Sequence, residues 1–185
     1  MDIPVYLFTG FLESGKTRFI QETMEDERFN TGEKTLLLVC EEGVEEYNPE
    51  RFCSPNVFIE EIEEEEDIND KLLSSLLKKH SAKRVLVEYN GMWQLKTLFD
   101  NLPKSWVIAQ EFMFAEATTI LNYNLNMRNL VAEKLTTCEL VVFNRYNDSV
   151  DKLELHKMVR GLNTRCAIAY ERADGNVEYD DIEDP

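Results

Sequence analysis

The chain lacks any long hydrophobic run and has few cysteines for its length of 185 residues. No apolar stretch approaches the roughly 20 residues of a transmembrane helix, and no basic region precedes the apolar stretch at the N-terminus. We therefore expect no membrane insertion and no signal peptide. The four cysteines, Cys40, Cys53, Cys138 and Cys166, are scattered without C-x-x-C spacing, which favours free thiols in a reducing, cytoplasmic setting.

Basic residues are also scarce, since 20 Lys and Arg face 36 Asp and Glu, giving a net charge of −16. This balance argues against nucleic acid or an anionic membrane as a partner, because both require clustered Lys and Arg. Residues 60–67 and 171–184 carry much of the acidic excess. Each segment could bind a cation or a basic partner, but we favour a solvated helix start and a solvated tail, because acidic residues suit the first turn of a helix.

Strand-like apolar runs alternate with helical patterns along the chain. The runs are continuous rather than alternating, which is typical of a parallel sheet covered on both faces. The predicted fold is α/β, a three-layer α/β/α sandwich with a mostly parallel central sheet. The expected strands are 5–9, 35–40, 57–60, 84–88, 105–110, 140–144 and 167–170, and the expected helices are 17–28, 68–79, 91–101, 113–135 with a break near 122–126, and 150–162.

Residues 1–172 are predicted to form one nucleotide-binding domain, whereas residues 173–185 look like an acidic, disordered tail or the start of a linker to a missing C-terminal domain. Ligands of such sheets bind beyond the C-terminal ends of the strands. The segments expected there are 10–17, 41–43, 88–91, 110–114 and 144–148.

The first of these segments reads Gly10-Phe-Leu-Glu-Ser-Gly15-Lys16-Thr17, which matches G-x-x-x-x-G-K-[ST]. It lies between a strand and a helix, as a phosphate-binding P-loop requires, so a chance match is disfavoured. Backbone N–H groups of such a loop point at phosphate oxygens, the lysine reaches the β- and γ-phosphates, and the threonine hydroxyl ligates Mg²⁺. The residues expected to bind nucleotide here are Gly10, Glu13, Ser14, Gly15, Lys16, Thr17 and Arg18.

Acidic residues follow two further strands. Glu88 ends a buried run and is followed three residues later by Gly91. In P-loop enzymes an acidic residue at this position holds Mg²⁺, and the glycine can offer its N–H to the γ-phosphate. Glu41 and Glu42 follow the second strand, and this turn could lend one carboxylate to the metal; solvated acids are an equally good interpretation. The predicted metal ligands are Thr17, Glu42 and Glu88.

The turn Asn144-Arg145-Tyr-Asn147-Asp148 resembles the N-K-x-D guanine-recognition motif. Arg145 can stack on a base as lysine does, because its guanidinium is planar. Asn147 occupies the position of the aspartate, with Asp148 one residue later. Either the turn shifts so that Asp148 contacts the base, or base selectivity is relaxed. An ordinary strand–turn–helix with Asn147 or Asp148 as N-cap is the alternative.

Taken together, residues 4–17, the Glu88-x-x-Gly91 pair and the order of the later strands resemble the CobW family of P-loop GTPases over nearly the whole chain. The resemblance implies GTP and Mg²⁺ as ligands, GTP hydrolysis, and a role in metal or cofactor handling with a client metalloprotein or transporter as partner. Three features depart from the family. Carboxylates replace its C-x-C-C motif between Val57 and Leu72, Glu13 and Arg18 replace small or hydroxyl residues, and the second domain is absent.

The predicted function is therefore a Mg²⁺-dependent GTP-binding domain that hydrolyses GTP slowly, with Lys16, Thr17 and Glu88 as its catalytic residues. Two alternatives remain open at this stage. The domain could be a nucleotide-binding switch or scaffold without useful hydrolysis, or an ATP-using P-loop phosphotransferase.

Overall fold

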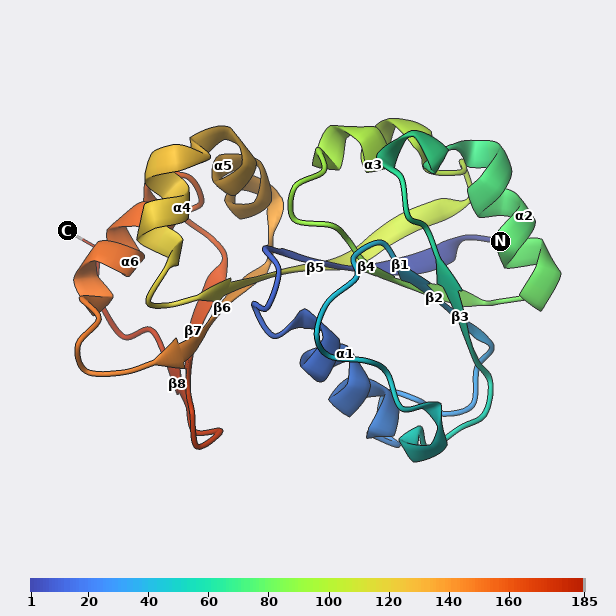
Figure 1. The fold of residues 1–185 in the computed structure, drawn as a ribbon, viewed down its shortest axis with the longest axis horizontal. Coiled ribbons are helices and arrows are strands. Elements are labelled where there is room, and N and C mark those ends of the chain that lie inside the picture. Colours follow the sequence, from blue (N-terminus) through green and yellow to red (C-terminus); the bar gives the residue numbers. More distant parts are fainter. Residues whose placement is uncertain (185) are drawn as a thin grey trace.

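The computed structural model describes residues 1–184, which fold around one twisted sheet (Figure 1). The strands are β1 (Ile3–Gly10), β2 (Thr35–Val39), β3 (Val57–Glu61), β4 (Arg84–Glu88), β5 (Trp106–Glu116), β6 (Leu140–Tyr146), β7 (Ala167–Arg172) and β8 (Val177–Tyr179). The helices are α1 (Lys16–Glu25), α2 (Asp70–His80), α3 (Leu95–Asn101), α4 (Ile120–Asn126), α5 (Arg128–Thr137) and α6 (Lys152–Arg160). Every helix within this part of the chain is too short or too polar to span a lipid bilayer.

The sheet has the strand order β3-β2-β4-β1-β5-β6-β7-β8. Every neighbouring pair is parallel except β7 with β8, which is antiparallel. This arrangement confirms the predicted α/β fold with a mostly parallel sheet. Because β1 lies between β4 and β5, the C-terminal ends of β1, β2, β4 and β6 come close together, and the loops that follow these strands can share one site.

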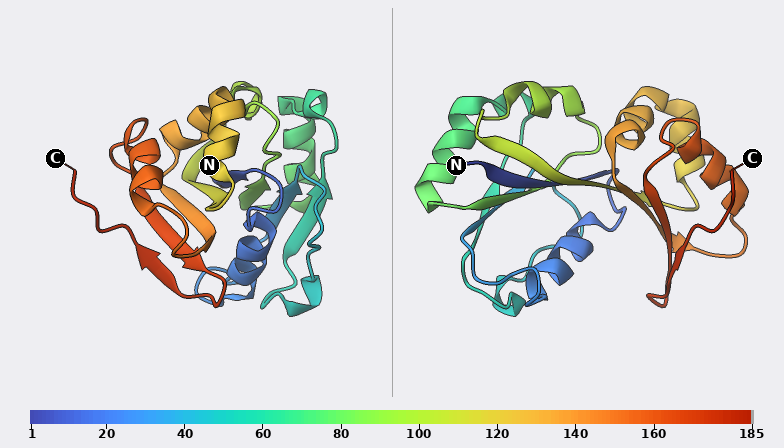
Figure 2. Two further views of the ribbon diagram at one scale, coloured as in Figure 1. Left: turned by 60° about the vertical axis from the view of Figure 1, so that its left-hand side comes forward. Right: turned by 180° about the vertical axis from the view of Figure 1, so that it is seen from behind.

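Helices cover both faces of the sheet (Figures 1 and 2). Ile20 and Met24 of α1 pack on one face against Phe8 and Leu86. On the other face, α2 and α3 cover β1, β2 and β4, whereas α4, α5 and α6 cover β5, β6 and β7. The continuous apolar runs of the sequence are explained by this burial, because the strand residues alternate between two covered faces.

Strand β5 is longer than the sequence pattern predicts. It runs to Glu116, whereas residues 113–116 were expected to begin a helix and 110–114 to lie beyond a strand end. Met113 and Ala115 pack on the α4–α5 side and Phe114 on the α1 side, so the run is an alternating buried strand between β1 and β6. The prediction that residues 110–114 lie beyond the end of a strand is therefore wrong. Strand β5 ends at Glu116 instead.

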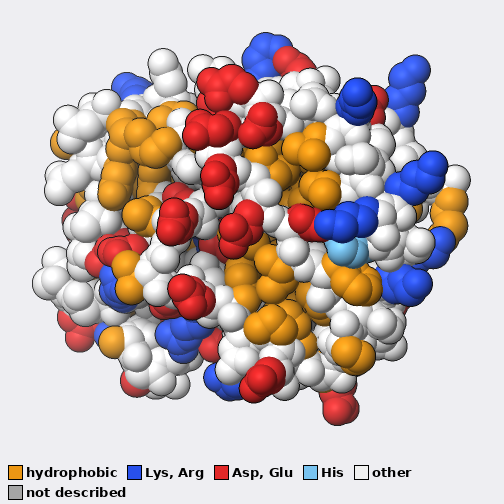
Figure 3. Space-filling view, turned by 45° about the vertical axis from the view of Figure 1, so that its right-hand side comes forward, with side chains coloured by type: hydrophobic (Ala, Val, Ile, Leu, Met, Phe, Trp, Pro, Cys, Tyr) orange, Lys and Arg blue, Asp and Glu red, His pale blue; other side chains and the backbone are white. Residues whose placement is uncertain are grey.

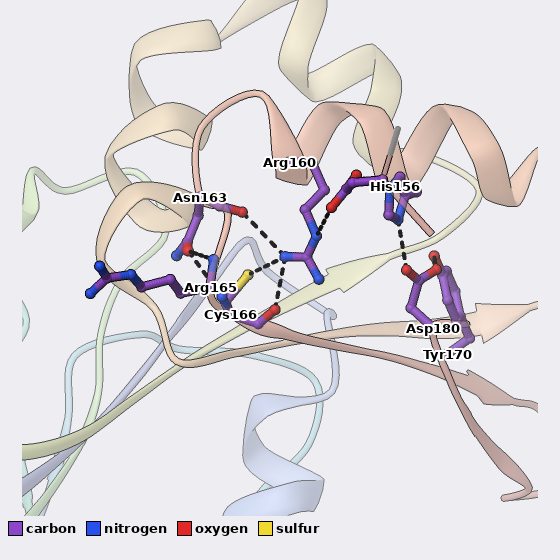
Figure 4. A network of polar contacts seen from close by, with 8 residues as sticks. His156, Arg160, Asn163, Arg165, Cys166, Tyr170 and Asp180 are labelled. Carbon is purple, nitrogen blue, oxygen red and sulfur yellow. Dashed lines mark hydrogen bonds and ion pairs between the residues drawn. The ribbon is translucent and has the colours of Figure 1, made fainter. Parts of the chain in front are cut away.

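The C-terminal segment adds regular structure to the sheet edge. Residues 177–179, expected to belong to a disordered tail, pair with β7 as β8. The Tyr170 hydroxyl donates to Asp180 at 2.7 Å, and the other oxygen of Asp180 lies 2.6 Å from Nδ1 of the buried His156 (Figure 4). Asp184 contacts the second ring nitrogen of His156 at 2.8 Å. These acidic residues thus have partners on α6 and β7, which a count of charges along the sequence does not reveal.

Candidate functional site

The loop between β1 and α1 has the backbone geometry of a phosphate-binding loop. Gly10 has φ of +134° and Gly15 has φ of +95°, values that L side chains rarely adopt. A Cβ at Gly10 would lie 2.0 Å from the carbonyl oxygen of Phe114, so a side chain does not fit there. Because Gly15 is followed directly by the first residue of α1, the loop places the N-terminal N–H groups of that helix at the cavity.

The two residues that depart from the family pattern here, Glu13 in the loop and Arg18 in the first turn of α1, keep their charges at the rim of the loop. Glu13 is an exposed residue with φ of +62°, a conformation that is uncommon for a side chain other than glycine. Arg18 is 55% exposed and pairs with Glu22 at 3.1 Å and Glu171 at 3.8 Å. The carboxylate of Glu13 can therefore remain in solvent when an anion is bound.

The Lys16 side chain lies buried in the loop. Its Nζ donates to the carbonyl oxygens of Gly10 and Tyr89, the latter at 3.1 Å. It also forms an ion pair with Glu41, and the two side chains are only 2% and 8% exposed. The ammonium group is thus held at the loop with a carboxylate as its charged partner.

A second set of contacts joins Thr17 to the end of β4. The Thr17 hydroxyl donates to one oxygen of Glu88 at 2.6 Å, and the Tyr47 hydroxyl donates to the other oxygen. Burial raises the pKa of Glu88, although the two hydrogen bonds and Lys16 act in the opposite direction. Burial and the adjacent Glu88 likewise raise the pKa of Tyr47. A hydroxyl and a carboxylate that face each other in this way are oxygen ligands suited to Mg²⁺.

Gly91 lies directly against the P-loop. A Cβ at this position would be 2.5 Å from the Gly10 carbonyl oxygen and 2.7 Å from the Cα of Phe11. The Gly91 N–H faces the second oxygen of Glu41 at 3.5 Å. Glu42, the predicted metal ligand of the neighbouring turn, is exposed and has no hydrogen-bond partner within residues 1–184. The carboxylate that the turn brings to the loop is that of Glu41.

The turn after β6 is only partly directed at the site. Asn144 lies beside Gly15, where a Cβ would be 3.0 Å from its Nδ2. Arg145 has φ of +51° and pairs with Glu116 at 3.4 Å. Asn147 accepts a hydrogen bond from the backbone N–H of Ser149 at 2.9 Å, and Asp148, which is 87% exposed, pairs with Arg172 at 3.0 Å. The structure therefore brings Asn144 to the P-loop and leaves Asn147 and Asp148 at the surface.

A cavity of about 420 Å³ lies over the P-loop. Two buried polar atoms at the loop, Oγ of Ser14 and Oδ1 of Asn144, have no hydrogen-bond partner in the described chain. A buried polar atom without a hydrogen-bond partner destabilises the folded state. Because these two atoms lie beside the cavity, a polar ligand bound there could supply the missing hydrogen bonds. The lining includes residues 12–19 of the P-loop and α1, Glu41, Glu45, Glu88, Asn144, Arg145, Glu171 and Arg172, but neither Asn147 nor Asp148.

An acidic groove of about 990 Å³ adjoins this cavity. It shares Leu12, Thr17, Glu41, Gly43, Glu45 and Glu88 with the cavity, so the two hollows are continuous beside the P-loop. Figure 3 shows acidic side chains gathered on one face of the molecule with hydrophobic side chains beside them. Eight glutamates line the groove, namely Glu41, Glu42, Glu45, Glu46, Glu61, Glu63, Glu64 and Glu88.

Sequence reasoning did not identify every residue of the site. Tyr47 lies eight residues beyond the end of β2, in a segment without motif or periodicity, and its contact with Glu88 depends on how that segment folds back. Glu171 and Arg172 line the cavity from the end of β7. Their position at the C-terminal end of a parallel strand is the one signal that could have indicated them.

Comparison with known proteins identifies the fold. No family description and no curated protein matches the sequence. Among solved structures, the hydrogenase maturation factor HypB from Archaeoglobus fulgidus is similar with a TM-score of 0.62 and 17% identity, over 94% of this chain and 82% of that one.

The Zn(II)-bound YjiA GTPase from E. coli is similar with a TM-score of 0.62 and 18% identity, over 96% of this chain and 60% of that one. A Zn(II)-bound triple mutant of YjiA is similar with a TM-score of 0.64 and 17% identity, again over 96% of this chain and 60% of that one. The chain thus spans about 60% of the length of YjiA. At these identities the likeness concerns the fold, and the chain therefore has the α/β fold that these proteins share.

Proposed function

We propose that this chain is a Mg²⁺-dependent domain that binds GTP and hydrolyses it slowly. The observation that carries this function is the convergence of Lys16, Thr17 and Glu88 at the mouth of a glycine-constrained loop. The buried, unpaired oxygens of Ser14 and Asn144 beside the same loop support a polar ligand.

Each residue has a distinct role in this scheme. Lys16 and the loop N–H groups bind the phosphate oxygens and stabilise the charge that develops on them during hydrolysis. Thr17 and Glu88 hold the metal ion, which when bound neutralises charge on the β- and γ-phosphates. Gly91 offers its N–H to the γ-phosphate from a position against the P-loop.

Slow turnover is expected from the state of the arginines around the cavity. Arg18, Arg145 and Arg172 line it, and each already pairs with a carboxylate, namely Glu22, Glu116 and Glu178 respectively. An arginine that contacts the reacting phosphate contributes roughly 10³–10⁵ in rate. With these side chains engaged elsewhere, we expect the intrinsic rate to lack that contribution.

Binding to the P-loop is tested by titrating labelled GTP in the presence of Mg²⁺ against the native chain and Lys16→Ala. The variant is expected to bind at least roughly tenfold more weakly, because a charge-assisted contact to phosphate is lost. Equal affinities of the two proteins would remove the P-loop assignment.

A switch or scaffold module without useful hydrolysis is the second candidate. The ion pair between Lys16 and Glu41 favours this candidate, because a carboxylate already balances the positive charge that hydrolysis would use. Single-turnover hydrolysis separates the two functions, because a pure binder releases no phosphate. An ATP-using phosphotransferase is the third candidate, and tighter binding of ATP than of GTP would support it.

Base recognition is proposed to depend on the turn after β6. If Asn147 meets the guanine N1 and N2 donors, its amide leaves one of them poorly matched, and Asn147→Asp should tighten GTP binding roughly ten- to a hundredfold. If Asp148 meets the base, it must first leave Arg172, and Asp148→Ala should abolish the preference for guanine. Affinities of both variants for GTP, XTP and ATP decide between these two arrangements. Three indistinguishable affinities in the native chain would exclude guanine recognition.

An accessory role in metal or cofactor handling is proposed from two sources, the resemblance to the CobW family and the fold shared with a hydrogenase maturation factor and a Zn(II)-bound GTPase. Within residues 1–184 there is no group of three or more His, Cys, Asp or Glu side chains arranged to hold a metal ion. We therefore propose that the domain acts through nucleotide-dependent contact with a client metalloprotein or transporter.

A further inference from the structure

The carboxylate of Glu41 contacts two groups that the proposed function assigns to the phosphates, namely the Lys16 ammonium and the Gly91 N–H. One oxygen forms the ion pair with Lys16, and the other faces the Gly91 N–H at 3.5 Å. The side chain is 8% exposed, so it lies inside the site rather than over it. A γ-phosphate presents oxygens of the same charge to the same ammonium and the same N–H.

The segment that carries Glu41 is held at the phosphate site at both ends. Glu41 follows β2 after a single residue, and its partner is the P-loop lysine. Tyr47 closes the segment through its hydrogen bond to Glu88, which in turn accepts from Thr17. Residues 42–46 between these two contacts are exposed, and four of them, Glu42, Gly43, Glu45 and Glu46, line the acidic groove.

We propose that Glu41 determines the preference of this site for triphosphate over diphosphate, because its carboxylate occupies the γ-phosphate position in the nucleotide-free protein. A triphosphate takes over Lys16 and the Gly91 N–H and displaces Glu41. A diphosphate contacts Lys16 through its β-phosphate but does not reach the Gly91 N–H, so it competes with Glu41 for only one of the two contacts. This inference rests on the proposed nucleotide site and adds to it a residue that competes with one phosphate of the ligand.

Electrostatics decide which group holds the lysine. Two anions cannot share one buried ammonium without repulsion, and at low local dielectric that repulsion is stronger than in water. Bound triphosphate brings several negative oxygens and a metal ion, whereas Glu41 brings one charge. The triphosphate therefore prevails, but its net affinity is reduced by the contacts of Glu41 that must be broken. Because Glu41 and Tyr47 flank residues 42–46, displacement of Glu41 also changes the rim of the acidic groove.

The test compares Glu41→Gln with Glu46→Gln as a matched control. Both variants remove one negative charge from the same segment, but Glu46 is exposed and has no ion-pair or hydrogen-bond partner within residues 1–184. Dissociation constants for GDP and for the slowly hydrolysed analogue GTPγS are measured with Mg²⁺ on the same preparation of each variant. The ratio of the two constants is independent of the fraction of folded protein.

Glu41→Gln is expected to tighten GTPγS binding by about tenfold and GDP binding by less than about threefold. Glu46→Gln should leave the ratio at its native value. Equal tightening of both nucleotides would show a general charge effect and overturn the assignment. Weaker GTPγS binding by Glu41→Gln would also overturn it, because Glu41 would then hold the bound metal or nucleotide.

The same measurements separate this inference from the proposed function. If the native chain binds both nucleotides in a manner that depends on Lys16 and the ratio does not move in Glu41→Gln, only the role of Glu41 fails. If Lys16→Ala binds as well as the native chain, the nucleotide site itself fails, and the role of Glu41 fails with it.

Discussion

Replacing Glu88 by Gln is expected to slow GTP hydrolysis by roughly 10²–10³-fold, because removal of one well-placed charged group from a transition-state contact costs about 3–4 kcal/mol. Glu88 lies 2.6 Å from the Thr17 hydroxyl and is the carboxylate best placed to share a metal ion with it. Glutamine keeps the shape and one acceptor oxygen but loses the negative charge. Single-turnover phosphate release from the native chain and the variant, at saturating GTP and Mg²⁺, measures the effect.

The same substitution is expected to stabilise the nucleotide-free protein at alkaline pH. Burial raises the pKa of Glu88 in the folded chain above its value in the unfolded chain. The stability associated with the protonated form is present below the unfolded pKa and is lost as the pH rises through the folded pKa. Gln carries no such dependence, so the variant should unfold at a higher temperature than the native chain at pH 8, and the difference should shrink at pH 5.5.

Thermal unfolding at the two pH values tests this linkage independently of hydrolysis. A variant that is less stable than the native chain at pH 8 would show that the charged carboxylate is stabilised by Thr17, Tyr47 and Lys16 more than it is penalised by burial. Unchanged hydrolysis in Glu88→Gln would remove Glu88 from the proposed catalytic group. Together the two measurements distinguish a buried carboxylate kept for function from one that serves the fold.

The sequence alone predicted the features that depend on local chemistry. The glycines of the P-loop, the strand before it and the helix after it lie within 25 residues, and the structure has β1 and α1 at these positions. The end of β4 at Glu88 follows from a short apolar run with a charged end. A break in the 113–135 helical pattern was predicted near residues 122–126, and the structure places it just beyond this range, at Met127 between α4 and α5.

Features that depend on packing between distant segments were not predicted. Residues 113–116 have no local property that separates a buried strand from the first turn of a helix, and pairing with β1 and β6 decides in favour of the strand. Glu41 and Glu42 are adjacent residues of the same type, and no local feature of the sequence indicates that Glu41 is the one that pairs with Lys16. The partners of Asp180 and Asp184 on α6 are likewise set by the hairpin of β7 and β8.

Gly10→Ala is expected to cost about 4 kcal/mol of unfolding free energy, which is near the upper end of single-residue effects. The new Cβ would lie 2.0 Å from the Phe114 carbonyl oxygen and 2.9 Å from Oγ of Ser14, at a φ of +134°. The carbonyl belongs to the backbone of β5, which is paired with β1 at this residue, so it cannot move without breaking the sheet next to the P-loop. Because the clash is with a backbone atom, rotation of a neighbouring side chain cannot relieve it.

Gly175→Ala is the matched control for this substitution. Gly175 also has positive φ, +88°, but nothing lies within 4 Å of an added Cβ, so only the backbone strain of about 1–2 kcal/mol is expected. Urea unfolding of the native chain and both variants measures the difference. Loss of a cooperative transition in Gly10→Ala alone would agree with the steric argument. Equal losses in the two variants would show that the φ angle, and not the contact with Phe114, fixes glycine at the end of β1.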